Sequence, residues 1–190
     1  MLALSGKDPW WSLIIFGEKC LETRSWAPGM RAAGNQAQPP FRVALHLSAQ
    51  MDAADRQQCY DDPVFRAAVE RHGVTFRRRK RDYEGSPSYD PIGLRPAGHI
   101  VGVATVALVE RMTKAGIPEG CFTRLAYQRT GPGWDPDQER AFGYYAAGRY
   151  AWLLTDVRPL ARPLPARGAL GLWKLPADLE AAVLGQLEER

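Results

Sequence analysis

The sequence predicts an α+β fold, a mixed small β-barrel flanked by helices. Segments with a strand pattern outnumber those with a helical pattern, and the two do not alternate as in a parallel sheet. A chain of 190 residues with 45% hydrophobic residues is suited to one domain with a sizeable core. We therefore expect residues 1–190 to form a single domain. A helical and basic-loop insertion is expected at about 48–97 and an irregular insertion at about 111–148.

The first expected element is a short helix within Pro9 to Trp26. Asp8 can cap this helix, and Pro9 suits its first position because the missing N–H has no helical partner there. Gly17 can end the helix because glycine tolerates a positive φ. A strand is expected directly afterwards.

Three charged side chains mark the region of this strand. Glu22 and Arg24 are two positions apart, so strand alternation places them on one face, together with Trp26. Lys19 can join them only if it lies in the turn after Gly17. Two interpretations remain open: a solvated surface ion pair that contributes little to stability, or a functional site.

The pattern of Phe41 to Leu47 predicts a half-buried strand, since large apolar residues occupy alternate positions. His46 points away from them and is expected to be a hydrogen-bonded structural residue. The stretch 48–72 turns helical, with Ser48 as the cap of a first helix and Asp62 as the cap of a second.

Five consecutive cations follow these helices. Such a run cannot be buried, so we expect an exposed loop. It is either a solvated loop or a set of phosphate contacts, with Tyr83 or Tyr89 available to stack on a base. The five residues are Arg77, Arg78, Arg79, Lys80 and Arg81.

The C-terminal half contains further strands. The nearly continuous apolar run 98–110 predicts a strand covered on both faces, where Gly102 indicates a bend or the close approach of another element. Strands are also expected at 150–157 and 168–175, and a terminal helix begins at about Pro176. A second basic stripe lies in this half and contains Arg158, Arg162, Arg167 and Lys174.

Composition narrows the function classes. The formal net charge of +4 permits nucleic-acid binding without establishing it. No apolar run approaches the ~20 residues that span a bilayer, and the N-terminus lacks a signal-peptide pattern, so a cytoplasmic protein without membrane contact is expected. The three cysteines are far apart and predict free thiols. No metal or cofactor is expected.

Four blocks give the sequence a resemblance to the ASCH domain family, named for the activating signal cointegrator 1 homology region, in the PUA-like superfamily. The resemblance implies a PUA-like β-barrel with a basic cleft and a role in binding RNA or DNA. It also implies that Lys19, Glu22 and Arg24 face this cleft. Family members often carry Gln before Pro-Trp, where this chain has Asp8, and a carboxylate at the rim would repel phosphate. The blocks are PWWSLIIFGEKCLETRSW at 9–26, RVALHLSAQ at 42–50, GHIVGVATVALVE at 98–110 and RYAWLLTDVRPLARPLPARGALGLWKL at 149–175.

The expected function is therefore binding of RNA or single-stranded DNA. Arg24 would offer a planar fork to phosphate or a base edge, Lys19 a point charge, and Glu22 an acceptor for a base amino group. Trp26 or Trp10 would supply a stacking wall, although burial in the core is expected for Trp10. The flanking backbone would contact Arg77, Arg78, Arg79, Lys80, Arg81, Arg167 and Lys174.

An enzyme is the alternative class. Some small ASCH proteins resemble amidohydrolases that remove an acyl group from N4 of cytidine, with a Lys-x-x-Thr motif and a distant glutamate. This chain keeps Lys19 but has Glu22 at the threonine position, and Glu110 and Glu139 are candidates for the distant glutamate. A carboxylate can act as a general base but not as that nucleophile.

Two further classes stay open. Other ASCH proteins resemble ribonucleases, for which Lys19, Glu22 and His46 are the candidates here. A protein-interaction module would instead use the segment 111–148.

Overall fold

A strongly curled, six-stranded mixed sheet forms the centre of the computed structural model, which describes residues 1–30, 37–48, 51–79, 89–128 and 135–188. Strands β1 and β3 pair in parallel and the other neighbours are antiparallel. The predicted α+β class is confirmed, and the expected barrel takes the form of a half-barrel. In sheet order the strands are β2 (Leu21–Arg24), β7 (Tyr150–Pro165), β6 (His99–Arg111), β3 (Phe41–Leu47), β1 (Leu2–Gly6) and β8 (Leu172–Lys174).

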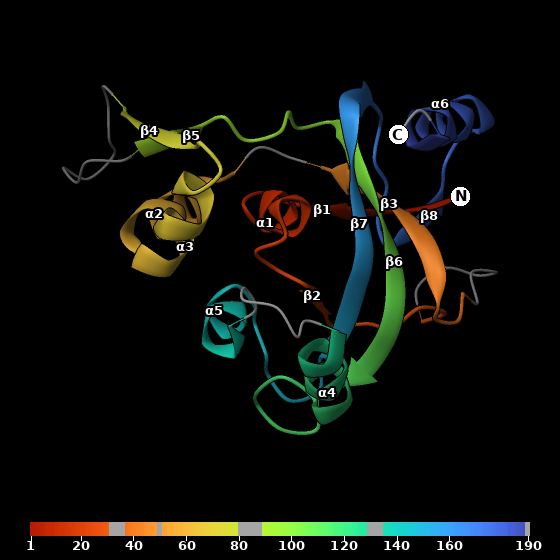
Figure 1. Ribbon diagram of the computed structural model, residues 1–190, viewed down its shortest axis with the longest axis horizontal. Helices are drawn as coiled ribbons and strands as arrows, with labels where there is room; N and C mark the ends of the chain where they lie inside the picture. The colour runs from red at the N-terminus through yellow and green to blue at the C-terminus, as the bar shows by residue number, and fades with distance from the viewer. Residues whose placement is uncertain (31–36, 49–50, 80–88, 129–134, 189–190) are drawn as a thin grey trace.

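Helices and one hairpin surround this sheet. Figure 1 shows α1 between the sheet and a group formed by α2, α3 and the β4–β5 hairpin, with α6 beyond the other side of the sheet. Helix α4 lies at the end of β6. The elements are α1 (Trp10–Phe16), α2 (Ala53–Asp61), α3 (Pro63–Glu70), α4 (Glu119–Gln128), α5 (Pro136–Ala141), α6 (Ala177–Glu188), β4 (Thr75–Arg78) and β5 (Tyr89–Ile92).

Helix α1 packs directly on the sheet. Trp11, Ile14 and Ile15 belong to the main buried cluster with residues of β3, β6 and β7. A Cβ atom on Gly102 would lie 2.4 Å from Cδ1 of Ile15 and 2.9 Å from the carbonyl oxygen of Arg158. The close approach predicted at Gly102 is therefore confirmed, and it fixes α1 over the middle of β6.

The C-terminal end of α1 follows the sequence prediction, whereas its N-terminal end is shifted by one residue. Gly17 has φ 82° and ends the helix in the left-handed region. Pro9 occupies the N-cap position, and the side chain of Asp8, one residue earlier, accepts a 3.1 Å hydrogen bond from the backbone N–H of Ser12. Burial raises the pKa of the Asp8 carboxyl to about 6, despite the hydrogen bond from Ser12.

Several expected boundaries are corrected. Asp52, rather than Ser48, caps α2 by accepting a 2.9 Å bond from the N–H of Asp55. The hydroxyl of Ser48 instead donates to the carbonyl oxygen of Gly6. Strand β4 takes up part of the expected basic loop, because a two-stranded hairpin leaves its arginine side chains in solvent. Strand β1 had no counterpart in the sequence analysis.

All three cysteines, Cys20, Cys59 and Cys121, are buried, and no disulfide joins them within the described residues. Among the residues that the structure covers, none of the helices has the length and apolarity to cross a bilayer.

Candidate nucleic-acid interface

A large hollow lies where the two ends of the curled sheet face each other. Its volume is about 740 Å³, which falls in the usual range for ligand pockets. Strand β1 contributes Ser5, β2 contributes Glu22 and Arg24, and α1 contributes Trp10 and Trp11. The loop of residues 166–171 between β7 and β8 completes the wall. We call this hollow the large cavity.

Arg24 is held in one orientation at this cavity. Its Nη2 donates a 2.7 Å hydrogen bond to the carbonyl oxygen of Ser5. Its Nε lies 2.9 Å from Oε1 of Glu22, and the guanidinium carbon lies 5.8 Å from the centre of the Trp11 ring. Strand alternation therefore brings Glu22 and Arg24 to one face, as predicted. A guanidinium fixed in this way loses little freedom when it binds a ligand.

The charged residues that line the large cavity are mostly cationic. Within the described part of the chain, its charged lining residues are Lys7, Arg24 and Arg167 and a single carboxylate, that of Glu22. Lys7 also forms ion pairs with Asp52 at 3.3 Å and Asp55 at 3.6 Å, which hold it at the rim. The cavity is thus suited to an anionic ligand with a polar edge.

His46 also lines the cavity but is buried and hydrogen-bonded on both sides. Its Nε2 lies 3.0 Å from the carbonyl oxygen of Ala166, which can only accept, so Nε2 carries a hydrogen. Burial lowers the pKa of His46, which favours the neutral ring. Nδ1 lies 3.1 Å from the hydroxyl oxygen of Ser5, and the carbonyl oxygen of Ala169 lies 3.0 Å from the same hydroxyl, so these two acceptors share its one hydrogen. This is the hydrogen-bonded structural histidine that the sequence predicts.

Lys19 does not share the large cavity with Arg24. Its side chain is 1% exposed, lies 3.4 Å from Oε1 of Glu139 and donates to the carbonyl oxygen of Leu21. It lines a smaller cavity of about 390 Å³, to which Trp10 and Glu22 also contribute. The expectation that all three charged heads line one hollow is therefore corrected: Glu22 borders both cavities, whereas Lys19 and Arg24 border one each.

Glu139 fixes the start of β2. Its Oε2 accepts a 2.8 Å bond from the N–H of Cys20, and its Oε1 accepts from the N–H of Leu21 at 3.1 Å and from the hydroxyl of Tyr145 at 2.9 Å. Burial and the Glu139 carboxylate raise the pKa of Tyr145, so its hydroxyl stays protonated. Helix α5 thereby fixes the strand that presents Glu22.

Of the two tryptophans considered for stacking, Trp10 was expected in the core, but it is Trp26 that is buried there. Trp26 is buried, and its ring packs edge-on against Trp152 at 5.0 Å and 79°. Trp10 instead lines both cavities. Strand β2 ends at Arg24, so its alternation does not extend to residue 26.

The basic residues expected to flank the site lie in separate places. Arg77, Arg78 and Arg79 are exposed on β4 or just after it, while Lys80, Arg81 and Tyr83 lie outside the described residues. Arg167 lines the large cavity. Lys174 is exposed on β8, where it pairs in register with Leu2.

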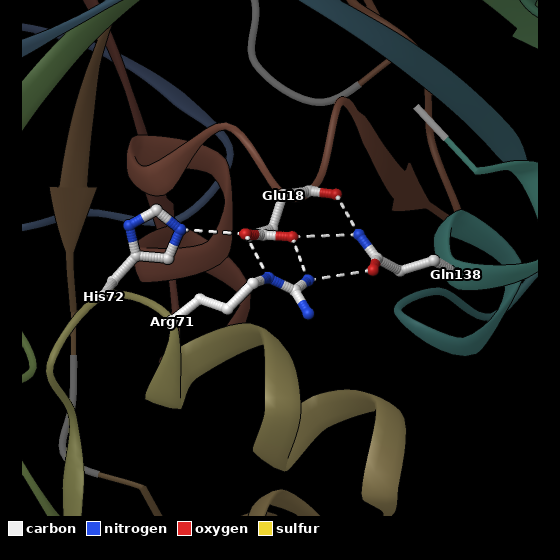
Figure 2. Close-up of polar contacts among 4 residues, drawn as sticks. All are labelled: Glu18, Arg71, His72 and Gln138. Carbon is white, nitrogen blue, oxygen red and sulfur yellow. Dashed lines mark hydrogen bonds and ion pairs between the residues drawn. The ribbon is translucent and has the colours of Figure 1, made fainter. Parts of the chain in front are cut away.

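A polar cluster that the sequence analysis missed supports the turn between α1 and β2. Figure 2 shows Glu18 at its centre. The carboxylate of Glu18 accepts from Nε of Arg71 at 3.1 Å, Nη2 of Arg71 at 2.6 Å and Nε2 of Gln138 at 3.0 Å, and lies 2.8 Å from Nε2 of His72. Burial alone would raise the pKa of Glu18, but the bonds from Arg71 and His72 lower it overall. Its partners lie 53 to 120 residues away, so no local pattern indicates them.

Among the described residues, no group of three or more His, Cys, Asp or Glu side chains is placed to hold a metal ion.

No protein-family model and no curated protein matches the chain. Solved structures do match it. This chain is similar to an ASCH protein. The crystal structure of ASCH from Zymomonas mobilis aligns with 97% of this chain and 93% of its own, with 14% identity and a TM-score of 0.42. Two mutants of that protein align with 97% of this chain, with 14% and 15% identity and TM-scores of 0.42 and 0.41; the alignments cover 96% and 94% of their chains.

Proposed function

We propose that the protein binds single-stranded nucleic acid, RNA in the first place, by holding one unstacked nucleotide in the large cavity. The observation that carries this proposal is the fixed guanidinium of Arg24. It is held by Glu22 and Ser5 against the ring of Trp11, at a hollow whose other charged side chains include Lys7 and Arg167.

Each part of the cavity has a matching part of a nucleotide. The planar fork of Arg24 fits a phosphate or the acceptor edge of a base, and the second oxygen of Glu22 can accept from a base amino group. Trp10 offers an aromatic surface for stacking, which contributes about 1–3 kcal/mol per base in single-strand binding. Lys7 and Arg167 at the cavity wall can contact the adjoining phosphates.

Fluorescence anisotropy with a labelled eight-nucleotide RNA of mixed sequence tests the proposal. We expect Arg24→Gln to weaken binding at least about tenfold, since hydrogen bonds to charged groups contribute about 1.5–3 kcal/mol. Arg124→Gln is the matched control, because Arg124 is exposed on α4 and lines none of the cavities described here. Equal affinities of wild type and Arg24→Gln would overturn the proposal.

Hydrolysis of a modified nucleoside is the second candidate function. It is favoured by one observation: Lys19, which is paired with the buried Glu139, lines the smaller cavity beside Glu22 and Thr23. Glu139 is one of the two candidates for the distant glutamate and lies 3.4 Å from Nζ of Lys19, but its oxygens already accept from two backbone N–H groups and Tyr145. These bonds favour a positioning role over proton transfer.

Incubation with N4-acetylcytidine separates the two candidates. Under the binding proposal, chromatography detects no cytidine above the level formed without protein. Release of cytidine that is abolished by Lys19→Met, with Arg124→Gln unchanged, would instead establish the hydrolase.

A further inference from the structure

A second basic hollow lies between α2, the β4–β5 hairpin and the segment that follows it. Its volume is about 570 Å³. Arginines from three segments line it, together with the two carboxylates of Asp8 and Asp90. We call it the arginine cavity; its arginines are Arg56, Arg77, Arg79 and Arg95.

Asp90 forms ion pairs with two of these arginines and, in the part of the chain that the structure describes, leaves some of their guanidinium N–H groups without a hydrogen-bond partner. Its Oδ1 lies 3.5 Å from Nε of Arg56 and 3.6 Å from Nη1 of Arg79, which are ion-pair distances at the long end. Nε of Arg56 is buried and makes no hydrogen bond within the described residues. Arg77 and Arg95 form no ion pair within the same part of the chain. Several guanidinium N–H groups are thus left to donate to an anion.

Asp8 does not neutralise these arginines. Its carboxylate is buried and accepts the N–H of Ser12, and burial raises its pKa to about 6. A guanidinium in contact with it would hold the pKa low instead. The carboxylate expected to repel phosphate at the basic cleft therefore lines the arginine cavity instead, and it forms no ion pair with these arginines within the described residues.

The arginine cavity and the large cavity are neighbours along the chain. Lys7 and Gly98 line the large cavity, whereas the adjoining residues Asp8 and Ala97 line the arginine cavity. Adjacent Cα atoms are about 3.8 Å apart, so the two hollows flank the same pair of chain segments. An extended ligand that occupied both would pass Lys7, which is paired with Asp52 and Asp55.

We propose that the arginine cavity binds a backbone phosphate of the nucleic acid whose base occupies the large cavity, an inference that rests on the function proposed above. Guanidinium groups bind phosphate oxygens in bidentate pairs, and the hollow is lined by Arg77 and Arg79 from β4 and the residue after it and by Arg95 from the segment after β5. The ligand is then an oligonucleotide, and a free nucleoside would leave this site empty.

The double variant Arg77→Gln/Arg95→Gln tests the site in the same anisotropy measurement, at several salt concentrations. For a single strand, log K falls linearly with log salt, and each lost phosphate contact makes this slope shallower by about 0.7. We expect the slope of the double variant to be shallower by about 0.7 to 1.4 and its affinity to fall about tenfold or more at low salt. Arg124→Gln should keep the wild-type slope, and circular dichroism should show all variants folded.

An RNA series with one neutral methylphosphonate linkage at each position in turn locates the contact. One position should weaken binding to the wild type and leave binding to the double variant unchanged, because the contact is already lost. If the double variant keeps the wild-type affinity and slope while Arg24→Gln weakens binding, the arginine cavity proposal fails and the proposed function stands. If only the double variant loses binding, the nucleotide site at Arg24 fails and the arginine cavity remains an independent anion site.

Discussion

The guanidinium of Arg24, on an edge strand, donates a 2.7 Å hydrogen bond to the carbonyl oxygen of Ser5, on the far side of the same six-stranded sheet. In the hydrogen-bonded order, β2 and β1 are separated by three strands. The curl of the sheet brings them together again, and the large cavity occupies the gap. Arg24 therefore bridges the open half-barrel at the cavity in which we propose that the nucleotide binds.

Replacement of Arg24 by Lys separates charge from geometry. Lysine keeps one positive charge but cannot contact Ser5, Glu22 and a ligand with one planar fork. We expect Arg24→Lys to weaken RNA binding about tenfold, equivalent to about 1.4 kcal/mol, and to leave its salt slope nearly unchanged. Anisotropy titrations at two or more salt concentrations measure both quantities. Wild-type affinity in this variant would mean that only the charge matters.

The buried pair of Lys19 and Glu139 predicts that loss of one partner destabilises the protein more than loss of both. Glu139→Gln leaves the buried ammonium of Lys19 without its counter-charge, and loss of one partner of a buried ion pair costs about 3–5 kcal/mol. Denaturant unfolding measures this loss. The double variant Lys19→Met/Glu139→Gln should recover part of it, because no unpaired charge remains. A Glu139→Gln protein as stable as wild type would contradict the buried pair.

Asp8 is expected to stabilise the folded state at low pH. This is the reverse of the pH dependence of a carboxylate that is stabilising as an ion. Its folded-state pKa is raised from 3.8 to about 6, so the folded state binds the proton more tightly than the unfolded chain does. Stability from this group is complete below about pH 3.8 and is lost as the pH rises through about 6.

Asp8→Asn keeps an acceptor for the N–H of Ser12 and removes the buried charge. We expect this variant to be more stable than wild type at pH 8, by up to about 3 kcal/mol, and equal to it near pH 3.5. Unfolding in urea at both pH values provides the comparison. A variant that is less stable than wild type at pH 8 would show that the carboxylate is favourable as an ion.

Local patterns predicted the elements whose partners are close in the chain or whose burial is regular. The alternation of Phe41–Leu47 gave β3 with the same bounds, and Asp62 and Gly17 marked helix ends because capping is a local interaction. Strand β1 was missed because it is only five residues long and is stabilised by its pairing with β3 and β8.

The site was less predictable because its decisive contacts are long-range. Alternation placed Glu22 and Arg24 together, but the fate of Lys19 depends on Glu139, 120 residues further along. The exchange between Trp10 and Trp26 depends on where β2 ends, which its pairing with β7 determines. No residue pattern near Arg24 indicates that Ser5 receives its hydrogen bond.

Gly168 provides a test of the cavity wall formed by the loop between β7 and β8. A Cβ atom there would lie 2.2 Å from Cε1 and 2.5 Å from Nδ1 of His46, so Gly168→Ala must displace the loop or the ring. Because His46 is buried on β3 and hydrogen-bonded to Ser5 of β1, we expect the loop to move and RNA binding to weaken about tenfold or more, the order of a lost hydrogen bond to Arg24. Gly185→Ala is the matched control: a Cβ there meets nothing within 4 Å, and alanine in α6 should stabilise the protein by about 0.5–1 kcal/mol. Anisotropy and thermal unfolding of both variants separate the effects, and unchanged RNA binding in a folded Gly168→Ala protein would remove this loop from the binding site.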